Sequence, residues 1–319
     1  MGVIIDTHVH LIKPFDRQWN RQRYTPNPAG PDDYLAVMES AGIDRGFFIS
    51  YSPDDIPADL AGKGIPMAAV RDTMNREYAL EVMRRFTDRF SWFPCHIGSR
   101  VPNRMDIARQ NLELGAAGLK LVLSFWGELP DDPRPLALCE LARDYGACII
   151  VDTSYWSLGK DEPYAAEPRS LPEGHREVAA KVKDFPDYLR HLDAMVTGFP
   201  GVNFSLAHAG AREFTPEHAR QIGAFIRRHA NVYADLGALD TGAPALEHLV
   251  ETAGSDRVMF GTDWPHFAQG AGMKEAIDRI RKPGRFPVNV SEAILGENAL
   301  SFVSHRAPGL SPAARRSGR

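Results

Sequence analysis

The stretch GLKLVLSFWGELPDDPRPLALCELARDYGACIIVDT, residues 118–153, contains the smallest unit from which the fold can be argued. Two short apolar runs, 118–123 and 148–153, enclose a segment with apolar residues at helical spacing, 136–145, which ends at Gly146. Apolar runs without polar alternation are typical of strands buried on both faces, and glycine commonly follows the last turn of a helix. The stretch therefore predicts a strand–helix–strand unit of a parallel sheet.

The same alternation extends over almost the whole chain. Further predicted strands cover residues 3–6, 46–50, 91–97, 202–208, 232–236 and 257–263. Further predicted helices cover residues 32–41, 77–86, 105–114, 216–229, 243–252 and 273–280. Eight strands alternating with helices favour an α/β fold of the closed (β/α)8, or TIM-barrel, type in a single domain. The rival is an open doubly wound sheet, which no Gly-x-Gly-x-x-Gly turn supports.

Three segments interrupt this alternation. Residues 12–31 follow the first predicted strand and residues 154–181 follow the fifth, so both are long loops at the barrel end that carries active sites. Loops of this length without a clear helix are commonly functional. Residues 306–319 contain four arginines and no acid. We expect them to be a disordered basic tail that follows a barrel domain of residues 1–305.

Composition excludes several classes of function. The chain has 37 Lys and Arg against 41 Asp and Glu, a net charge of −4, which gives no basic field to attract nucleic acid. The first residues lack a basic region, and no apolar run reaches about 18 residues, so we expect neither a signal peptide nor a membrane partner. The three cysteines form no CxxC motif and favour a reducing cytoplasm. A small-molecule substrate is the partner that remains.

Two histidines, His8 and His10, end the first predicted strand in DTHVH. Side chains two apart on an extended strand face the same side, so both rings could reach one metal ion, although such pairs also occur as capping or surface residues. His208 ends VNFSLAH on the sixth predicted strand, and Asp263 ends RVMFGTD on the eighth. A carboxylate there is costly to bury unless it is paired or bound to a cation. Together these residues predict a metal site at one mouth of the barrel.

The motifs DTHVH, GLKL, SLAHAG and FGTDWPH, in this order, resemble the amidohydrolase superfamily. The closer likeness is to its aminocarboxymuconate-semialdehyde decarboxylase-like branch. The resemblance implies a (β/α)8 barrel with one or two divalent metal ions at the carboxyl ends of the strands. It further implies that His8, His10 and Asp263 are ligands and that Asp263 also accepts a proton from water. His208 would be either a ligand or a charge-stabilising acid/base.

One position departs from the family pattern. Where the family has a histidine ligand at the end of the fifth strand, this chain has Asp152 in CIIVDTSYW. Asp152 is either a ligand itself, alone or as a bridge between two ions, or a structural or substrate-binding carboxylate beside a weakened or lost metal site. As a ligand it would favour Mn²⁺, Fe²⁺ or two ions over a lone Zn²⁺.

Lys120 lies in the middle of the fourth predicted strand. It forms a salt bridge or a substrate contact, or it bridges two metal ions as carbamylated lysines do in some superfamily members.

Further residues follow the predicted strands and could line the same mouth. The candidates for substrate binding are His96, Trp126, Tyr155, Trp156 and His266. The alternative for each is packing at the rim. An aromatic rim suits a large apolar or planar substrate, and His96 could hold a carboxylate.

Two reactions use the same metal and base. We favour hydrolysis of an amide, ester, lactone or thioester of a small organic acid or acyl substrate, with Asp263 and His208 as catalytic residues. The reason is that Asp152 would make the site anionic and a second ion more plausible. The alternative is non-oxidative decarboxylation of an aromatic or unsaturated carboxylic acid. A third possibility is a binding protein with a degenerate site. The resemblance implies a homodimer, and the Arg- and Ala-rich composition indicates a bacterial source.

Overall fold

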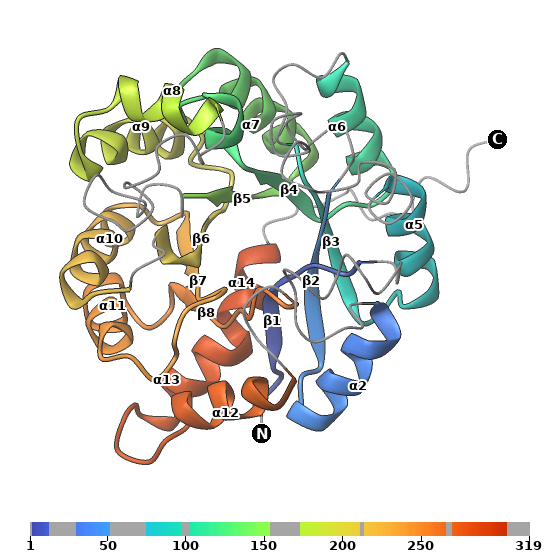
Figure 1. Ribbon diagram of the computed structural model, residues 1–319, viewed down its shortest axis with the longest axis vertical. Coiled ribbons are helices and arrows are strands. Elements are labelled where there is room, and N and C mark those ends of the chain that lie inside the picture. Colours follow the sequence, from blue (N-terminus) through green and yellow to red (C-terminus); the bar gives the residue numbers. More distant parts are fainter. Residues whose placement is uncertain are drawn as a thin grey trace.

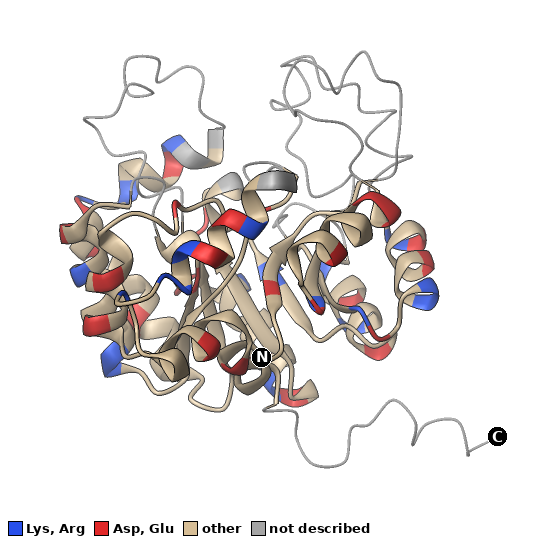
Figure 2. Cartoon of the chain, turned by 90° about the horizontal axis from the view of Figure 1, so that it is seen from below, with Lys and Arg blue, Asp and Glu red and all other residues tan. Residues whose placement is uncertain are grey.

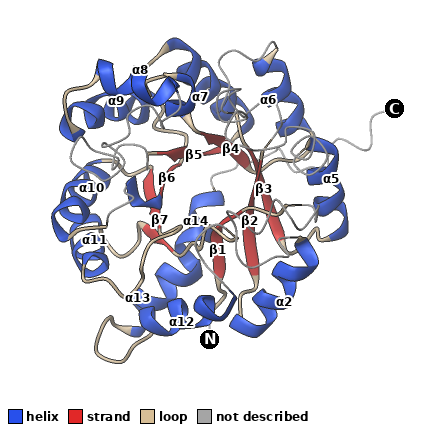
Figure 3. Cartoon of the chain, viewed as in Figure 1, coloured by secondary structure: helices blue, strands red, loops and turns tan. Residues whose placement is uncertain are grey.

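The computed structural model describes residues 2–12, 30–51, 75–96, 103–153, 173–210, 214–265 and 270–304. Its parallel strands form a ring that helices surround on the outside (Figure 1; Figure 3). The strands are β1 (Ile5–Val9), β2 (Arg45–Ser50), β3 (Phe90–Pro94), β4 (Gly118–Leu121), β5 (Cys148–Asp152), β6 (Phe204–Ala207), β7 (Val232–Asp235) and β8 (Val258–Met259). The fold is the (β/α)8 barrel that the alternation predicts.

Each strand is followed, directly or after a loop, by helical segments. The α-helices are α2 (Pro31–Ala41), α5 (Arg76–Arg85), α6 (Arg104–Glu113), α7 (Pro133–Tyr145), α8 (Glu173–Lys181), α9 (Phe185–Gly198), α10 (Pro216–Arg228), α11 (Ala245–Ala253), α12 (Gly270–Ile280), α13 (Val288–Glu292) and α14 (Asn298–Val303). Shorter helical turns are η2 (Leu123–Trp126), η6 (His208–Gly210) and η7 (Ala293–Glu297). Gly42 and Gly146 end α2 and α7 at φ 75° and 58°, the left-handed conformation expected of C-cap glycines.

The ring closes at two seams. β1, β2 and β3 form one parallel sheet, and β4 to β8 form another. A parallel bridge between Cys95 and Lys120 joins β3 to β4, and a bridge between Val9 and Trp264 joins β1 to the segment after β8. Because β8 is only two residues long, the second seam depends on the backbone that follows it rather than on a long strand. This seam brings the two ends of the barrel sequence side by side.

Side chains of the strands point alternately into and out of the barrel. The interior cluster comprises Ile5, Phe47, Ile49, Phe93, Ala117, Cys148, Ile150, Ala207, Tyr233, Met259, Ala299 and Phe302. A larger buried cluster fills the layer between the strands and the outer helices. The strands are therefore buried on both faces, which explains their continuous apolar sequences.

The segment after β5 differs from the sequence prediction. Residues 173–181, expected to belong to a long loop, form α8, and a further helix, α9, follows where none was predicted. The N-cap of α9 is Asp184, whose side chain accepts a hydrogen bond from the Asp187 N–H. Tyr188, Leu192 and Met195 are buried at helical spacing, so the sequence did contain the signal. Most of the loop predictions, and the tail at 306–319, lie outside the described residues.

The outer surface of the described chain carries mixed charge. Lys and Arg alternate with Asp and Glu over the outer helices (Figure 2), in agreement with the near-neutral balance of the sequence. Among the described helices, none combines the length and the apolar character that a bilayer crossing requires.

Phe302 of α14 closes the barrel at the end where the strands begin. Its ring lies 5.5 Å from that of Tyr233 and 6.1 Å from that of Phe47, and its carbonyl oxygen accepts hydrogen bonds from Asn203 and Cys148 at the starts of neighbouring strands. Phe302 is fully buried. It therefore forms the floor of the interior, opposite the strand ends.

We expect Phe302→Ala to lower the free energy of unfolding by about 3–5 kcal/mol, because it removes a buried aromatic ring and leaves a cavity. Urea-induced unfolding measures the change. Leu300→Ala, at a position of the same helix that is 39% exposed, is the matched control and should change stability little. Equal effects of the two substitutions would contradict this role of Phe302.

Candidate metal centre

β1 carries two histidines to the end of the barrel where the strands finish. His8 lies on the strand and His10 follows it, with their ring centroids 5.2 Å apart. Asp263 arrives from the other end of the sequence, after β8. Its Oδ1 lies 3.6 Å from His8 Nε2 and 3.1 Å from His10 Nε2. The structure thus brings together three buried residues that the sequence singled out.

The second nitrogen of each histidine ring has a fixed acceptor. His8 Nδ1 lies 3.1 Å from Asp235 Oδ1, and His10 Nδ1 lies 3.1 Å from the carbonyl oxygen of Ile49. A carboxylate and a carbonyl only accept, so each Nδ1 carries the proton and each Nε2 presents its lone pair. Metal-binding histidines are commonly oriented in this way by a partner behind the ring. The lone pairs of both rings therefore face Asp263.

His8, His10 and Asp263 fit a divalent metal ion. Two ligand atoms about 2.1 Å from a shared ion are about 3.0–3.4 Å apart for bond angles between 90° and 109°. The two distances from Asp263 Oδ1 to the imidazole nitrogens, 3.6 and 3.1 Å, are close to this range, and the ligand atoms of all three residues lie within 4.8 Å of one another. Burial, followed by the charge of Lys120, lowers the pKa of His8 to about 4. The ring is then neutral at physiological pH, as a ligand must be.

Asp235, at the end of β7, is a site residue that the sequence analysis missed. Its Oδ1 accepts hydrogen bonds from His8 Nδ1 and from the backbone N–H groups of His208 and Gly237, at 3.0–3.1 Å. Ser205 donates to its Oδ2 at 3.3 Å. His8, His208 and Asp235 also lie close enough to form a second three-ligand group. Because Asp235 Oδ1 already accepts three hydrogen bonds, we interpret it as a support for the histidines. A carboxylate ending the apolar run VYAD was the available signal.

A second buried carboxylate, Asp6, joins β1 to the segment after β8. It accepts hydrogen bonds from the Thr262 N–H and hydroxyl at 2.9 and 2.6 Å, from the Tyr34 hydroxyl at 2.6 Å and from the His8 N–H at 3.1 Å. Burial raises the pKa of Asp6 to about 6, although these hydrogen bonds act in the opposite direction. Asp263 follows with φ 60° and donates its N–H to the His8 carbonyl at 2.8 Å. These contacts fix Asp263 relative to β1.

His208 stands beside the three-residue group. Its ring centroid lies 4.6 Å from that of His8, and its Nδ1 lies 2.8 Å from the Gly237 carbonyl oxygen. Its Nε2 lies 3.7 Å from Asp152 Oδ2. Burial alone would lower the pKa of His208, but contact with Asp152 and the charges of Asp152 and Asp263 raise it to about 9. A proton held on Nε2 by Asp152 is compatible with the charge-stabilising role.

Asp152 lies among cations. Its Oδ2 is 3.5 Å from Lys120 Nζ and 3.7 Å from His208 Nε2. In the described part of the chain, Asp152 belongs to no group of three side chains spaced to hold an ion. The arrangement supports a carboxylate paired with Lys120 over a ligand that bridges two ions.

The predicted rim residues take different positions. Tyr51 stacks on His10 with ring centroids 5.0 Å apart, and Trp126 packs with Tyr51 against buried Cys95 and Val122. Tyr51 therefore lies beside the candidate metal centre, and Trp126 packs on the same small cluster as Tyr51.

His96, a candidate for substrate binding at the barrel mouth, instead contacts an outer helix. Its Nε2 lies 3.4 Å from Asn111 Nδ2 of α6, outside the group around His8, and the side chain is buried. Burial, followed by the charge of Arg104, lowers the pKa of His96 to about 3. The structure therefore gives His96 a packing role. Tyr155, Trp156 and His266 lie outside the described residues.

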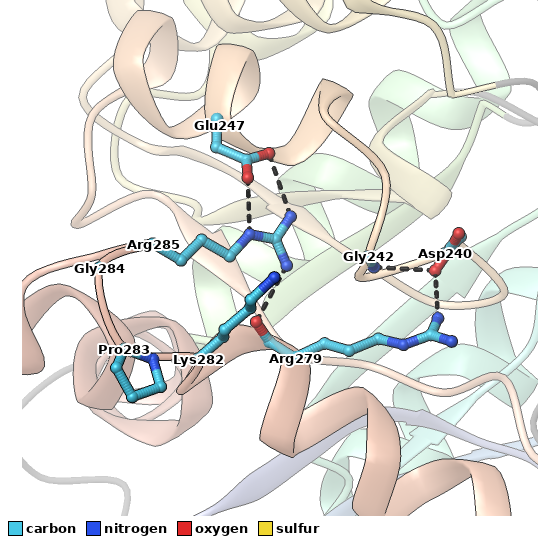
Figure 4. A pocket seen from close by; sticks show the side chains of 8 residues that line it. All are labelled: Asp240, Gly242, Glu247, Arg279, Lys282, Pro283, Gly284 and Arg285. Atoms are coloured by element: carbon cyan, nitrogen blue, oxygen red, sulfur yellow. Dashed lines mark hydrogen bonds and ion pairs between the residues drawn. The ribbon is translucent and has the colours of Figure 1, made fainter.

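A pocket of about 550 Å³ lies elsewhere, between α11 and the chain after α12 (Figure 4). Its charged groups are largely paired. Arg285 forms a bidentate contact with Glu247 at 2.7 and 3.0 Å, and Arg279 contacts Asp240 at 2.6 Å. None of its lining residues belongs to the group around His8. We interpret the pocket as part of the outer ion-pair network.

We expect Asp235→Asn to weaken metal binding by about 10–100-fold, because the oxygen of a neutral amide is a weaker acceptor for the His8 Nδ1–H than a carboxylate oxygen. Competition with a chromophoric chelator measures the affinity. Asp256→Asn, at a side chain that is 70% exposed, is the matched control. Equal metal affinity in the two variants would show that Asp235 does not orient the ligand.

His96 predicts a pH dependence of stability. Between its ordinary pKa of 6.5 and its folded value of about 3, the unfolded chain binds a proton that the folded chain does not. Stability from this group is therefore lost as pH falls from 6.5 towards 3. We expect His96→Gln to lose less stability than the unmodified protein between pH 7 and pH 5 in urea unfolding. Parallel losses in both proteins would refute the assignment.

Comparisons with known proteins agree with the barrel fold. An uncharacterized TIM-barrel protein from Bordetella bronchiseptica is 17% identical, with a TM-score of 0.65 over 95% of this chain and 98% of the other. A dihydroxybenzoic acid decarboxylase from Polaromonas sp. JS666, solved with manganese and the inhibitor 2-nitroresorcinol, is 15% identical, with a TM-score of 0.63 over 97% and 99%. A probable 2-pyrone-4,6-dicarboxylic acid hydrolase from Acinetobacter baumannii, with citric acid bound, is 13% identical, with a TM-score of 0.60 over 95% and 99%.

At this level of identity the solved structures establish the fold, and no curated protein sequence matches the chain. A sequence model of the amidohydrolase family matches residues 5–303, nearly the whole chain. With the barrel and the candidate metal ligands in place, the chain belongs to the amidohydrolase family, in agreement with the resemblance of its motifs.

Proposed function

We propose that this amidohydrolase-family enzyme uses one divalent metal ion to decarboxylate a small aromatic or unsaturated carboxylic acid without oxidation. The observation that carries the proposal is the ion pair between Lys120 and Asp152, whose charged atoms lie 3.5 Å apart. The earlier reason to prefer hydrolysis was that Asp152 would make the site anionic. A carboxylate balanced by an ammonium adds no net negative charge, so that reason no longer opposes an acid substrate.

The second reason for hydrolysis was a second ion bridged by Asp152. Asp152 stands apart from the group formed by His8, His10 and Asp263. A further dication beside the buried Lys120 ammonium would be repelled. A single ion held by two imidazoles and one carboxylate is therefore the arrangement we propose. Zn²⁺, Mn²⁺ and Fe²⁺ all accept such ligands.

The chemistry divides among the residues around this ion. When bound, the ion would supply a Lewis acid that polarises an oxygen of the substrate. Asp263 takes up a proton from solvent and delivers it to the carbon that loses CO2. The carbon–carbon bond breaks, its electron pair remains on that carbon to form the new C–H bond, and CO2 leaves. The His208 imidazole stabilises negative charge on a substrate oxygen. Tyr51 and Trp126 provide the apolar wall against which a planar ring packs.

Hydrolysis remains the second candidate for a specific reason. Asp263 Oδ1 lies in the candidate ligand group, 3.1 Å from His10 Nε2. In this position the carboxylate could accept a proton from a water molecule instead of delivering one to carbon. Hydrolysis is compatible with the similar fold of the probable 2-pyrone-4,6-dicarboxylic acid hydrolase. Decarboxylation is equally compatible with the similar fold of the dihydroxybenzoic acid decarboxylase. Both reactions need the same three ligands, so the assay must separate their products.

The direct test incubates the metal-loaded protein with a panel of hydroxylated benzoic acids and, separately, with esters, lactones and thioesters. We expect stoichiometric CO2 from at least one acid, and Asp263→Asn to reduce this turnover by at least about 10²-fold through loss of the proton donor. Asp240→Asn, on the outer surface, is the control and should retain activity. Acyl cleavage without CO2 from any acid would replace decarboxylation by hydrolysis.

A further inference from the structure

Lys120 is the most deeply buried cation of the site. Its side chain has no solvent exposure and lies on β4 opposite Ile150, in the row of β5 that faces the barrel interior. Its Nζ makes no hydrogen bond to any residue that the structure describes. The nearest carboxylate oxygen, Asp152 Oδ2, is 3.5 Å away, beyond the usual 2.7–3.2 Å of an N–H···O bond. An ammonium with three donors is costly to bury in this state.

The neighbouring carboxylates are committed to other groups. Asp235 accepts from His8 and from two backbone N–H groups, and Asp152 is shared with His208. The charge of Lys120 nevertheless acts on two neighbours. It adds to burial in lowering the pKa of His8, and, against the effect of burial, it adds to the larger effects of His8 and His208 in lowering the pKa of Asp235. Lys120 therefore lies beneath the candidate metal centre with its donors incompletely used.

We propose that Lys120 Nζ binds an anionic oxygen of the substrate, which makes a small organic carboxylate the class of molecule that this site selects. The inference deepens the proposed function and depends on it only for the reaction that follows binding. The ammonium, at the floor of the mouth, receives a carboxylate or phenolate oxygen, and Tyr51 and Trp126 flank the rest of the molecule. Lys120 is then a specificity-determining residue as well as the partner of Asp152.

The competing explanation is that Lys120 only balances the charge of Asp152. The two explanations differ when both residues are changed. If Lys120 is only a counter-ion, removing both charges together should restore anion binding. If Lys120 contacts the anion, Asp152→Asn alone should preserve or strengthen anion binding, since it removes a competing acceptor, and the double variant should remain as weak as the lysine variant.

The experiment uses the metal-loaded protein and two probes of the same shape, benzoate and neutral benzamide, with affinities measured by calorimetry. We expect the unmodified protein to prefer benzoate, and Lys120→Met to weaken benzoate binding at least about tenfold while benzamide binding changes little. Lys183→Met, which removes an exposed lysine of the same charge, is the control. Metal content and melting temperature are measured for every variant, and Lys120→Gln replaces Lys120→Met if the latter does not fold.

Two results would overturn the assignment. One is an unmodified protein that binds benzoate no better than benzamide. The other is recovery of benzoate affinity in the Lys120→Met, Asp152→Asn double variant. Failure of the proposed reaction is seen separately, because these affinities are measured without turnover. A protein that selects benzoate through Lys120 but releases no CO2 would keep this inference and lose the decarboxylase proposal.

Discussion

The seam between β1 and the chain after β8 is the constraint on which the site depends. Thr7 donates to the Phe260 carbonyl at 2.9 Å, Asp263 donates to the His8 carbonyl at 2.8 Å, and Asp6 links both sides through Thr262. Residues more than 250 positions apart thereby become neighbours. If this seam opened, the two histidines would lose Asp263, and no remaining part of the described site would put a carboxylate in the same place. The geometry of the candidate metal centre is thus a consequence of closing the barrel.

Charge pairing decides the chemistry that the site favours. Counted alone, Asp6, Asp152, Asp235 and Asp263 make the mouth strongly anionic. In the folded chain Asp6 and Asp235 are held by hydrogen bonds, Asp152 faces Lys120, and Asp263 faces the imidazoles. In our proposal, what remains for a substrate is a candidate site for a dication with a buried ammonium and an imidazole beside it. Such a site would attract an organic anion, and this balance moves our preference from hydrolysis to decarboxylation.

The outer helices show why some predictions fell short. The strand–helix alternation predicts no helix at residues 185–198, although the apolar residues of α9 recur at helical spacing. His96 was assigned to the mouth from its place after β3. Strand alternation instead directs its ring outward to Asn111 of α6. Asp235 ends an apolar strand with a carboxylate, as Asp263 does, but it belongs to none of the motifs that carry the family resemblance.

The sequence by itself determined the barrel, its eight strands and the candidate ligands His8, His10 and Asp263, because apolar periodicity and the two-residue spacing on a strand are local properties of the chain. The tertiary structure decided the partners. Whether Asp152 joins a metal centre or Lys120, and whether His8 has a carboxylate behind its ring, depends on which side chains the strands β4 to β7 carry to the same point. Such distances are set by the closure of the barrel, which no short stretch of sequence contains.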